Sequence, residues 1–378
     1  MVITRYLPLP ADQGAKQRTA ALLARLADRF QLTVCGFDDG TADGDALRGI
    51  GATVGGRWPT AIPGRASGLA RSRSLSASKC WSSDLFERLR RTVAARPADV
   101  VVLEFPQMGA YLRAVPDAPL VLALHNVESA LAESWARTKP AALRPPFLTE
   151  AALLRRLERR LLRDADVVSV AGAPDVARLP RRRSDVLVCP NGIEPGAPLP
   201  DADSPGAAFI GHMSFPPNVD GAMWLATRVW PRVLAAVPDA ELALVGGQPA
   251  AAVRRLASPT IRVTGRLHDV RPELQRARVA LAPLRAGGGT RLKVLEALNA
   301  GRPVVATPIG AEGLESLAGK GLVIAEGPAA FAAAVSGLLQ DPDLAARLGR
   351  AGNQAVRDFS WDRNLTPLVD RIRSAARG

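Results

Sequence analysis

The chain has 378 residues, 47% hydrophobic and 22% charged, a composition typical of a globular protein with more than one domain. It contains no continuous apolar run of about 18 residues, which argues against a membrane-spanning helix. The N-terminus lacks the basic and apolar segments of a secretory signal, so we expect a cytoplasmic protein. The net charge of +13 favours an anionic partner: a phosphorylated ligand, a membrane surface or nucleic acid.

Basic residues gather in two stretches. Between residues 51 and 100 there are nine Lys/Arg against three Asp/Glu, and this stretch includes the Gly/Ser/Arg-rich segment 64–81. The second stretch, RRLERRLLR (155–163), has helical periodicity. Such a stretch is either a solvated helix face or a surface that attracts an anionic acceptor or membrane. Peripheral contact at the inner face of the cytoplasmic membrane is therefore one expectation.

Short apolar segments alternate with helical periodicities along the first half of the chain. The predicted strands are VITRY (2–6), LTVCGF (32–37), DVVVLEF (99–105), LVLAL (120–124), DVVSVAG (166–172) and DVLVCP (185–190). The predicted helices cover residues 15–28, 83–95, 127–136 and 147–163. This alternation is typical of a parallel sheet with helices on both faces.

A Pro-, Gly- and Asp-rich segment then interrupts the pattern, and a second alternation follows it. The predicted strands are AAFIG (207–211), ELALVG (241–246), IRVTG (261–265), VALAPL (279–284), PVVAT (303–307) and LVIAE (322–326). The predicted helices cover residues 220–235, 249–256, 291–300, 328–339, 342–357 and 359–375.

These patterns predict an α/β protein of two Rossmann-like domains facing each other across a cleft. We expect a first domain over 1–195, a linker over 196–206 and a second domain over 207–357. Residues 358–378 are expected to form a C-terminal helix that returns to the first domain. Open sheets of this kind bind ligands at the carboxyl ends of their strands, so each domain is expected to hold one substrate.

The segment PLRAGGGTRLKVLEALNAG (283–301) joins a predicted strand to a helix. Its three glycines, at residues 287–289, allow backbone N–H groups to approach a ligand closely. Thr290 is expected to cap a helix that begins near Arg291. Because a helix N-terminus presents free N–H donors and partial positive charge, this junction suits a phosphate group.

Three charged side chains follow this junction. Arg291 and Lys293 oppose the dipole in the expected first helical turn, a penalty that a bound diphosphate would reverse. The alternative is a surface pair between Lys293 and Glu296. Glu296 itself lies in an apolar stretch, where ribose hydroxyls would satisfy it, unless it is an ordinary surface glutamate.

No metal site or cofactor is expected. The three cysteines and three histidines are scattered, without a C-x-x-C motif. Three Asp-x-Asp triplets, at 164/166, 201/203 and 341/343, are interpreted as capping or solubility features because none follows a strand where a metal ion would be needed.

The motifs resemble a known family. GGGTRLKVLEALNAGRPVVATPIGAEGLE (287–315) resembles the donor-site signature of the retaining GT-B glycosyltransferases called family 4, or glycosyl transferase group 1. Further similar segments are FIGHMSFPPNVDGAMWL (209–225), ELALVGGQP (241–249), VTGRLHDV (263–270), HNVE (125–128) and CPNGIE (189–194). They run in the family's order over nearly the whole chain.

The resemblance implies roles for individual residues. Gly211 corresponds to a tight turn near the diphosphate, Arg266 and Leu267 to the segment that holds the base, and Glu296 to a ribose ligand. The predicted donor-binding residues are Gly211, Arg266, Leu267, Gly287, Gly288, Gly289, Thr290, Leu292 and Glu296. The predicted catalytic residues are His125, Arg291 and Lys293.

The chain departs from the family's pattern in two places. Gly288 stands where the family's E-x7-E motif has its first glutamate, which binds hydroxyls of the donor sugar. A subgroup with a GGTRLK-type loop also has no glutamate there. The family's basic pair after the first strand of the second domain is missing as well, so Arg291 and Lys293 are expected to supply the positive charge.

Candidate residues of the first domain lie at strand ends. His125 follows the predicted strand LVLAL, where the resemblance places it beside the reacting sugar, although a histidine at a strand end is often a packed residue. Gly14, Gln17 and Glu104 are the predicted acceptor-side residues. The roles of Gln17 and of the adjacent Arg18 are open.

The resemblance implies metal-independent transfer, with retention, from a nucleotide-diphosphate sugar, usually a UDP or GDP sugar. The acceptor is a glycan, a lipid-linked glycan or a small molecule, as in polysaccharide biosynthesis. A nucleotide-sugar 2-epimerase and a non-catalytic sugar or nucleotide binder are the alternatives. Nucleic acid is not an expected partner because aromatic residues make up only 4% of the chain.

Overall fold

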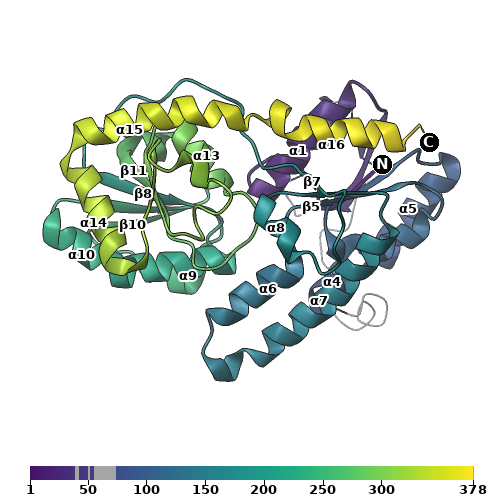
Figure 1. The fold of residues 1–378 in the computed structure, drawn as a ribbon, viewed down its shortest axis with the longest axis horizontal. Helices are drawn as coiled ribbons and strands as arrows, with labels where there is room; N and C mark the ends of the chain where they lie inside the picture. The colour runs from purple at the N-terminus through teal and green to yellow at the C-terminus, as the bar shows by residue number, and fades with distance from the viewer. Residues whose placement is uncertain (39–41, 50–51, 55–73, 378) are drawn as a thin grey trace. The chain divides into compact units, whose positions relative to one another are not determined.

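The computed structural model describes residues 1–38, 42–49, 52–54 and 74–377 (Figure 1). Of the basic segment 64–81, residues 64–73 lie outside the described residues. The chain divides into two compact units: unit 1 contains Met1–Pro190 and Asp362–Gly378, and unit 2 contains Asn191–Trp361. Within the described ranges, we find no helix with both the length and the apolar character needed to cross a membrane.

The described strands of unit 1 form a seven-stranded sheet in the order β3-β2-β1-β4-β5-β6-β7. All neighbouring pairs are parallel. The strands are β1 (Val2–Tyr6), β2 (Leu32–Phe37), β3 (Ala52–Val54), β4 (Val101–Leu103), β5 (Leu120–Leu124), β6 (Val167–Val170) and β7 (Leu187–Val188). Every residue of β4, β5 and β6 is buried, which explains why these strands are continuous apolar runs in the sequence.

Helices surround this sheet (Figure 1). They are α1 (Gly14–Ala27), α2 (Gly44–Gly49), α4 (Leu75–Ser78), α5 (Ser83–Ala95), α6 (Glu128–Arg137), α7 (Pro145–Asp164), α8 (Ala173–Arg178) and α16 (Trp361–Ala375), with 3-10 helices at Pro106–Ala114 and Ala141–Leu143. Helices α6 and α7 pack along each other as a hairpin. Except for Trp361, α16 belongs to unit 1, where Asp362 lies 2.8 Å from Arg25 of α1.

The strands of unit 2 form a six-stranded sheet in the order β10-β9-β8-β11-β12-β13, again with parallel neighbours. They are β8 (Gly206–Ile210), β9 (Glu241–Val245), β10 (Ile261–Gly265), β11 (Ala277–Ala282), β12 (Val304–Ala306) and β13 (Leu322–Ile324). The helices are α9 (Pro216–Trp224), α10 (Trp230–Ala236), α11 (Ala251–Arg254), α12 (Arg271–Arg276), α13 (Leu292–Asn299), α14 (Gly327–Gln340) and α15 (Pro342–Ala355), with 3-10 helices at Glu315–Leu317 and Val356–Phe359. Large aromatic side chains fill the core, with Phe209, Trp230 and Phe331 at most 1% exposed.

Two predicted elements of this part of the chain differ in the structure. The helix expected over 220–235 begins at Pro216 and contains a π-helical turn at Leu225–Val229. Pro231 opens α10 and has no N–H to donate, which explains why the α-helical ladder is interrupted there.

Residues 196–206 were expected to link the domains, but they lie inside unit 2. The N–H of Gly196 donates to Asn299 Oδ1 at 3.0 Å, and Asn353 Nδ2 donates to the Gly196 carbonyl at 3.1 Å. Arg302 reaches the carbonyl of Pro200. These bonds satisfy the irregular backbone and attach the segment to α13 and α15.

Both sheets have the doubly wound, Rossmann-like arrangement that the sequence predicts. The chain builds one side of each sheet, returns to the centre and then builds the other side. This reversal falls between β1 and β4 in unit 1 and between β8 and β11 in unit 2. Ligands of such sheets bind at the carboxyl ends of the strands at this point, so the loops after these four strands are where a site is expected.

Candidate functional site

In unit 2, the glycine-rich loop and the turn containing Gly211 are neighbours because they follow the adjacent strands β11 and β8. The backbone is tightly packed here. A Cβ atom on Gly246 would lie 1.8 Å from the Gly211 carbonyl oxygen, and φ at Gly246 is 151°. Only glycine permits this approach, which holds the turn after β8 against the end of β9.

The loop after β11 also requires glycine. Gly287 has φ of 152° and Gly289 has φ of 68°, conformations that residues with side chains rarely adopt. A Cβ atom on Gly287 would lie 2.8 Å from a guanidinium nitrogen of Arg291. The predicted glycine loop is therefore formed around the Arg291 side chain.

Arg291 is 7% exposed, and its guanidinium turns back into the loop. Its Nε donates to the Ile309 carbonyl at 3.1 Å, another nitrogen donates to the Gly288 carbonyl, and a third lies 3.4 Å from Glu312 Oε2. In the structure Arg291 thus braces two loops. Direct contact between Arg291 and a phosphate group stays a prediction.

The helix begins one residue later than predicted. Arg291, with ψ of 89°, is the N-cap residue of α13, and Thr290 precedes it. Thr290 is buried, and its carbonyl accepts a 2.8 Å hydrogen bond from Asn191 Nδ2. The expected N-cap at Thr290 is therefore wrong, because the Arg291 contacts hold the backbone out of the helical conformation.

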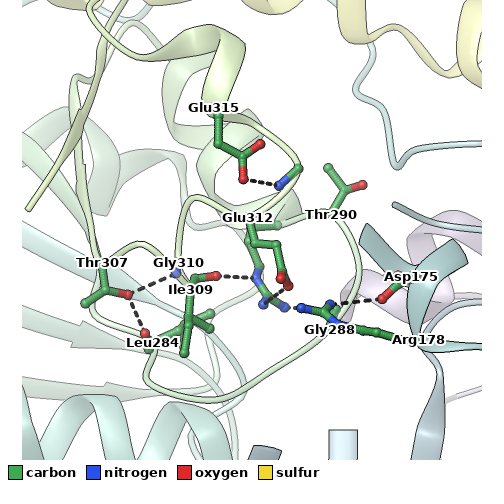
Figure 2. A network of polar contacts seen from close by, with 12 residues as sticks. Asp175, Arg178, Leu284, Gly288, Thr290, Thr307, Ile309, Gly310, Glu312 and Glu315 are labelled. Atoms are coloured by element: carbon green, nitrogen blue, oxygen red, sulfur yellow. Dashed lines mark hydrogen bonds and ion pairs between the residues drawn. The ribbon is translucent and has the colours of Figure 1, made fainter. Parts of the chain in front are cut away.

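A second loop, 307–315, supports the first one (Figure 2). Thr307 Oγ1 donates to the Leu284 carbonyl and accepts from the Gly310 N–H at 2.9 Å. Glu315 accepts from the Gly313 N–H at 3.0 Å. Together with Arg291 and Glu312, these bonds form a pre-arranged backbone structure at the carboxyl edge of β11 and β12.

Lys293 lies half-buried in the first turn of α13. Its Nζ donates to Asn218 Oδ1 at 2.7 Å and lies 4.6 Å from the centroid of the Phe209 ring. A Cβ atom on Gly211 would lie 2.8 Å from this Nζ, so the amine rests against the turn after β8. Burial, and to a smaller extent the charge of Arg291, lower the pKa of Lys293 to about 7, while Glu296 opposes the shift.

The other predicted donor-side residues lie on the same edge or beside it. Glu296 is half-buried one turn after Lys293, whereas Leu292 is 8% exposed. Arg266 is exposed after β10, and a Cβ atom on Gly247 would lie 3.5 Å from its Cβ. Leu267 packs against the apolar cluster that includes Val245. Contacts of these residues with a base or a ribose stay predictions.

In unit 1, the structure brings Glu104 and His125 together at the carboxyl ends of β4 and β5. Glu104 is 1% exposed, accepts from Thr19 Oγ1 at 2.6 Å, and lies 3.2 Å from His125 Nε2. The His125 ring packs against Phe105 at 4.6 Å between centroids. A buried carboxylate therefore orients the histidine that the sequence singles out.

Helix α1 supplies the remaining predicted residues of this edge. Gly14 is its exposed first residue and Gln17 is half-buried. Arg18 is buried, and desolvation lowers the pKa of its guanidinium although the charges of Cys189 and Glu104 raise it. Acceptor contacts of Gly14, Gln17 and Glu104 stay predictions.

Several residues of the two edges were missed by sequence reasoning. Asn218 accepts a hydrogen bond from Lys293, and its Nδ2 donates one to the His212 carbonyl at 2.9 Å. Glu128, which accepts from Gln107 Nε2 at 2.9 Å, has its pKa raised by burial and lies at the start of α6. The sequence signal for Glu128 is its position in HNVE, three residues after His125.

Among the residues that the structure describes, no group of three or more His, Cys, Asp or Glu is placed to hold a metal ion. Several of the Asp-x-Asp aspartates have protein partners. Asp341 accepts from the Leu344 N–H at the start of α15, and Asp166 accepts from the Leu120 N–H.

Comparison with solved structures defines the class of protein. The fold is similar to that of sucrose-phosphate synthase from Thermosynechococcus elongatus, with a TM-score of 0.78 and 17% identity over 99% of this chain and 98% of that chain. It is also similar to Anabaena HepE, solved with UDP and glucose, with a TM-score of 0.68 and 16% identity over 99% of each chain. The likeness shows the GT-B fold of two Rossmann-like domains.

Family models then identify the family. The model described as a glycosyl transferase 4-like domain matches residues 13–192, and the model for glycosyl transferases group 1 matches residues 204–341. The chain belongs to the group 1, family 4 type of glycosyltransferases. This agrees with the resemblance carried by the glycine-rich segment.

One curated relative is an uncharacterized 44.6 kDa protein in the cps region of Klebsiella pneumoniae. It is 27% identical over 139 residues, which is 33% of this chain. The match spans about a third, 34%, of that relative's length.

Proposed function

We propose that the protein transfers a sugar from a nucleoside-diphosphate sugar to an acceptor hydroxyl. The observation that carries the proposal is the arrangement at the β8/β11 edge: a half-buried lysine rests against a glycine turn, beside a braced glycine loop that opens a helix. Backbone N–H groups and a cation at such a place suit a diphosphate. The complex of the similarly folded Anabaena protein with UDP and glucose supports a UDP sugar as the first donor to test.

The proposed reaction develops charge where this edge can stabilise it. The bond between the anomeric carbon and the β-phosphate oxygen breaks, the acceptor oxygen bonds to that carbon, and the acceptor proton passes to the departing diphosphate. Negative charge then grows on the departing diphosphate. Lys293 and the N–H groups at the start of α13 stabilise that charge, so we propose a metal-independent reaction.

Arg291 contributes to the proposed site in a different way from Lys293. Its guanidinium already binds the Gly288 and Ile309 carbonyls, so its main contribution is to hold the loop in shape. Glu296, one turn further along α13, accepts hydrogen bonds from the ribose hydroxyls. Because Gly288 has no side chain to bind the sugar, backbone groups of the loop recognise it.

We propose that the acceptor binds at the Glu104–His125 edge of unit 1. The buried Glu104 fixes the position of the His125 ring, which then contacts the reacting groups. Retention at the anomeric carbon is proposed on the family likeness. The proposed acceptor is a glycan, a lipid-linked glycan or a small molecule, and the cps region named for the Klebsiella relative supports polysaccharide assembly.

A non-catalytic nucleotide or sugar binder is a second candidate, favoured by Gly288 in place of a glutamate. Incubation with UDP-glucose separates the two: an enzyme releases UDP by slow hydrolysis or by transfer, whereas a binder releases none. A 2-epimerase would instead change the sugar while leaving it on the nucleotide.

The testing experiment is a thermal shift with UDP, GDP, ADP and TDP, without added metal. Saturation to about 100 times Kd stabilises a protein by about 2.7 kcal/mol, enough to raise the melting temperature by several degrees. We expect one nucleotide to do so for the wild type and for the exposed-lysine control Lys320→Met. The shift should be much smaller for Lys293→Met. If no nucleotide stabilises the wild type at millimolar concentration, the proposed donor site is wrong.

A further inference from the structure

The exposed face of helix α7 changes character along its length. Residues spaced three or four apart share a face of a helix, and this face contains Leu148, Ala152, Arg156, Arg159, Arg160 and Arg163. All six are exposed. The opposite face contains Ala151, Leu154, Leu161 and Leu162, which are at most 3% exposed. The outward face is therefore apolar in its first turns and cationic in its last turns.

The apolar end lies at the tip of the α6–α7 hairpin. Leu143 is 57% exposed and Leu148 is 47% exposed, and the adjoining Pro145 and Pro146 are also exposed. Two basic residues adjoin them in the chain: Arg144 is exposed and donates to the Lys139 carbonyl at 3.0 Å, and the Lys139 amine lies 3.6 Å from the Trp135 ring centroid. Apolar side chains gathered at a tip and rimmed by cations mark an interaction site.

The cationic end borders an open cavity of about 420 Å³. Its lining residues are Arg156, Arg159, Arg160, Arg163, Pro180 and Arg181. Asp164 lies 2.9 Å from Arg163 and 3.7 Å from Arg160, and Arg159 donates to the Pro180 carbonyl at 3.1 Å. The charge of Asp164 offsets only part of that of the five lining arginines, so this end stays strongly positive and attracts an anionic surface.

We propose that the exposed face of α7 docks on an anionic lipid bilayer. The hairpin tip, with Leu143 and Leu148, enters the headgroup boundary while the arginine row contacts lipid phosphates. A soluble polyanion would explain the arginines but not the exposed leucines, and an apolar protein partner would explain the leucines but not the arginines. The bilayer accounts for both.

Helix α6 joins the proposed docking surface to the candidate acceptor site. Helix α6 begins at Glu128, soon after β5 and His125, and leads to the hairpin tip. A lipid-linked acceptor held in the bilayer would thus lie near the edge proposed to receive it. The docking itself does not depend on the transferase reaction, and its test uses no nucleotide.

The test is co-sedimentation of the full chain with two kinds of vesicle. One is phosphatidylcholine alone, and the other contains about one-third phosphatidylglycerol, which supplies the anionic surface. The first variant replaces the four exposed arginines of α7 by glutamine: Arg156→Gln, Arg159→Gln, Arg160→Gln and Arg163→Gln. Its control removes the same charge from exposed arginines of unit 2: Arg228→Gln, Arg232→Gln, Arg254→Gln and Arg255→Gln.

We expect the wild type and the control to bind the anionic vesicles and to leave phosphatidylcholine unbound. The α7 variant should lose on the order of 100-fold or more in partitioning, since each arginine near such a surface contributes about fivefold. Leu143→Ser with Leu148→Ser should lose about tenfold or more. Leu75→Ser, which removes an equally exposed leucine of α4, should lose little.

Three results would overturn the proposal. The wild type could ignore both vesicles, or the control could lose as much as the α7 variant, which would indicate general electrostatic attraction. The leucine variant could bind as the wild type does while the arginine variant fails, which would indicate a site for soluble polyanions. Circular dichroism and nucleotide thermal shifts on each variant show that it is folded, so lost docking is distinguishable from a lost donor site.

Discussion

The carboxyl edges of the two sheets have the same topology but different chemistry. In unit 2 the edge is built from backbone: Gly211, Gly246 and the 287–289 loop approach one another closely, and Arg291 is used to brace carbonyls. In unit 1 the edge is built from side chains: Glu104 is buried between Thr19 and His125. One edge presents N–H groups in a fixed loop, whereas the other presents an oriented acid and histidine.

This difference indicates how two similar domains of a transferase can recognise different substrates, one the diphosphate and the other the acceptor. A diphosphate is the same in every nucleotide sugar, and backbone amides recognise it without relying on any particular side chain. Acceptors vary, and side chains at strand ends can change without altering the fold. Substitutions in unit 2 should therefore act through backbone geometry, and those in unit 1 through charge and orientation.

The largest effect is expected at the backbone contact of unit 2. Gly246→Ala places a Cβ atom 1.8 Å from the Gly211 carbonyl oxygen, so the turn after β8 must move. We expect nucleotide affinity to fall about 100-fold and stability to fall by about 3 kcal/mol. Gly247→Ala, whose Cβ would make an ordinary 3.5 Å contact with Arg266, is the matched control. Calorimetric titration measures the nucleotide affinity, and thermal melting measures the stability. Equal losses of affinity and stability in the two variants would contradict the backbone account.

An intermediate effect is expected at the side-chain edge of unit 1. Glu104→Gln keeps the shape but removes the charge that faces His125, so kcat for transfer or for UDP release from UDP-glucose should fall about 100-fold. The affinity for the nucleotide should not change, because we propose that unit 2 binds it. A loss of nucleotide affinity equal to the loss in kcat would show that the two edges do not divide the work as described.

The smallest effect is expected away from both edges, between α6 and α7. Glu158 is fully buried, accepts from Ser129 Oγ at 2.5 Å, and has its pKa raised to about 7 by burial. The folded chain therefore binds more protons than the unfolded chain between pH 4.5 and 7, and stability from this group is lost as pH rises through that window. Glu158→Gln cannot ionise, so this fall in stability with rising pH should disappear. The variant should therefore be more stable than the wild type by about 1–2 kcal/mol at pH 8.

Melting temperatures measured from pH 5 to pH 8 test this expectation. The variant and the wild type should have similar stability at the acid end and diverge toward the alkaline end. Divergence in the opposite direction would mean that the Glu158 carboxylate is stabilised in the fold.

The fold was predictable because its central strands are apolar runs of the right length. β1, β2 and β5 begin and end at the predicted residues. The strand β3 was missed because Ala52–Val54 lies between glycines in the sequence, at 51 and at 55–56, and glycines there are typical of a loop. The π-helical turn at Leu225–Val229 was missed because its cause, Pro231, is tolerated at the start of the helix that follows.

The candidate site was predictable in place but only partly in arrangement. The glycines and Lys293 were found because they follow one another in the chain. That the Arg291 guanidinium would reach the Ile309 carbonyl, 18 residues away, could not be read from local sequence. Asn218 was missed for the same reason, since it meets Lys293 only because β8 and β11 pair in the folded sheet.

The central claim is that Lys293 becomes charged when a diphosphate binds beside Gly211. Because burial holds the pKa of the free lysine near 7, a bound anion should raise it, and the protein should take up a proton on binding above that pH. The measurement is calorimetric titration at about pH 8 with the nucleotide that gives the thermal shift, in two buffers of different ionisation enthalpy. We predict uptake of close to one proton by the wild type and almost none by Lys293→Met. No proton uptake by the wild type, or equal uptake by both proteins, would contradict the account.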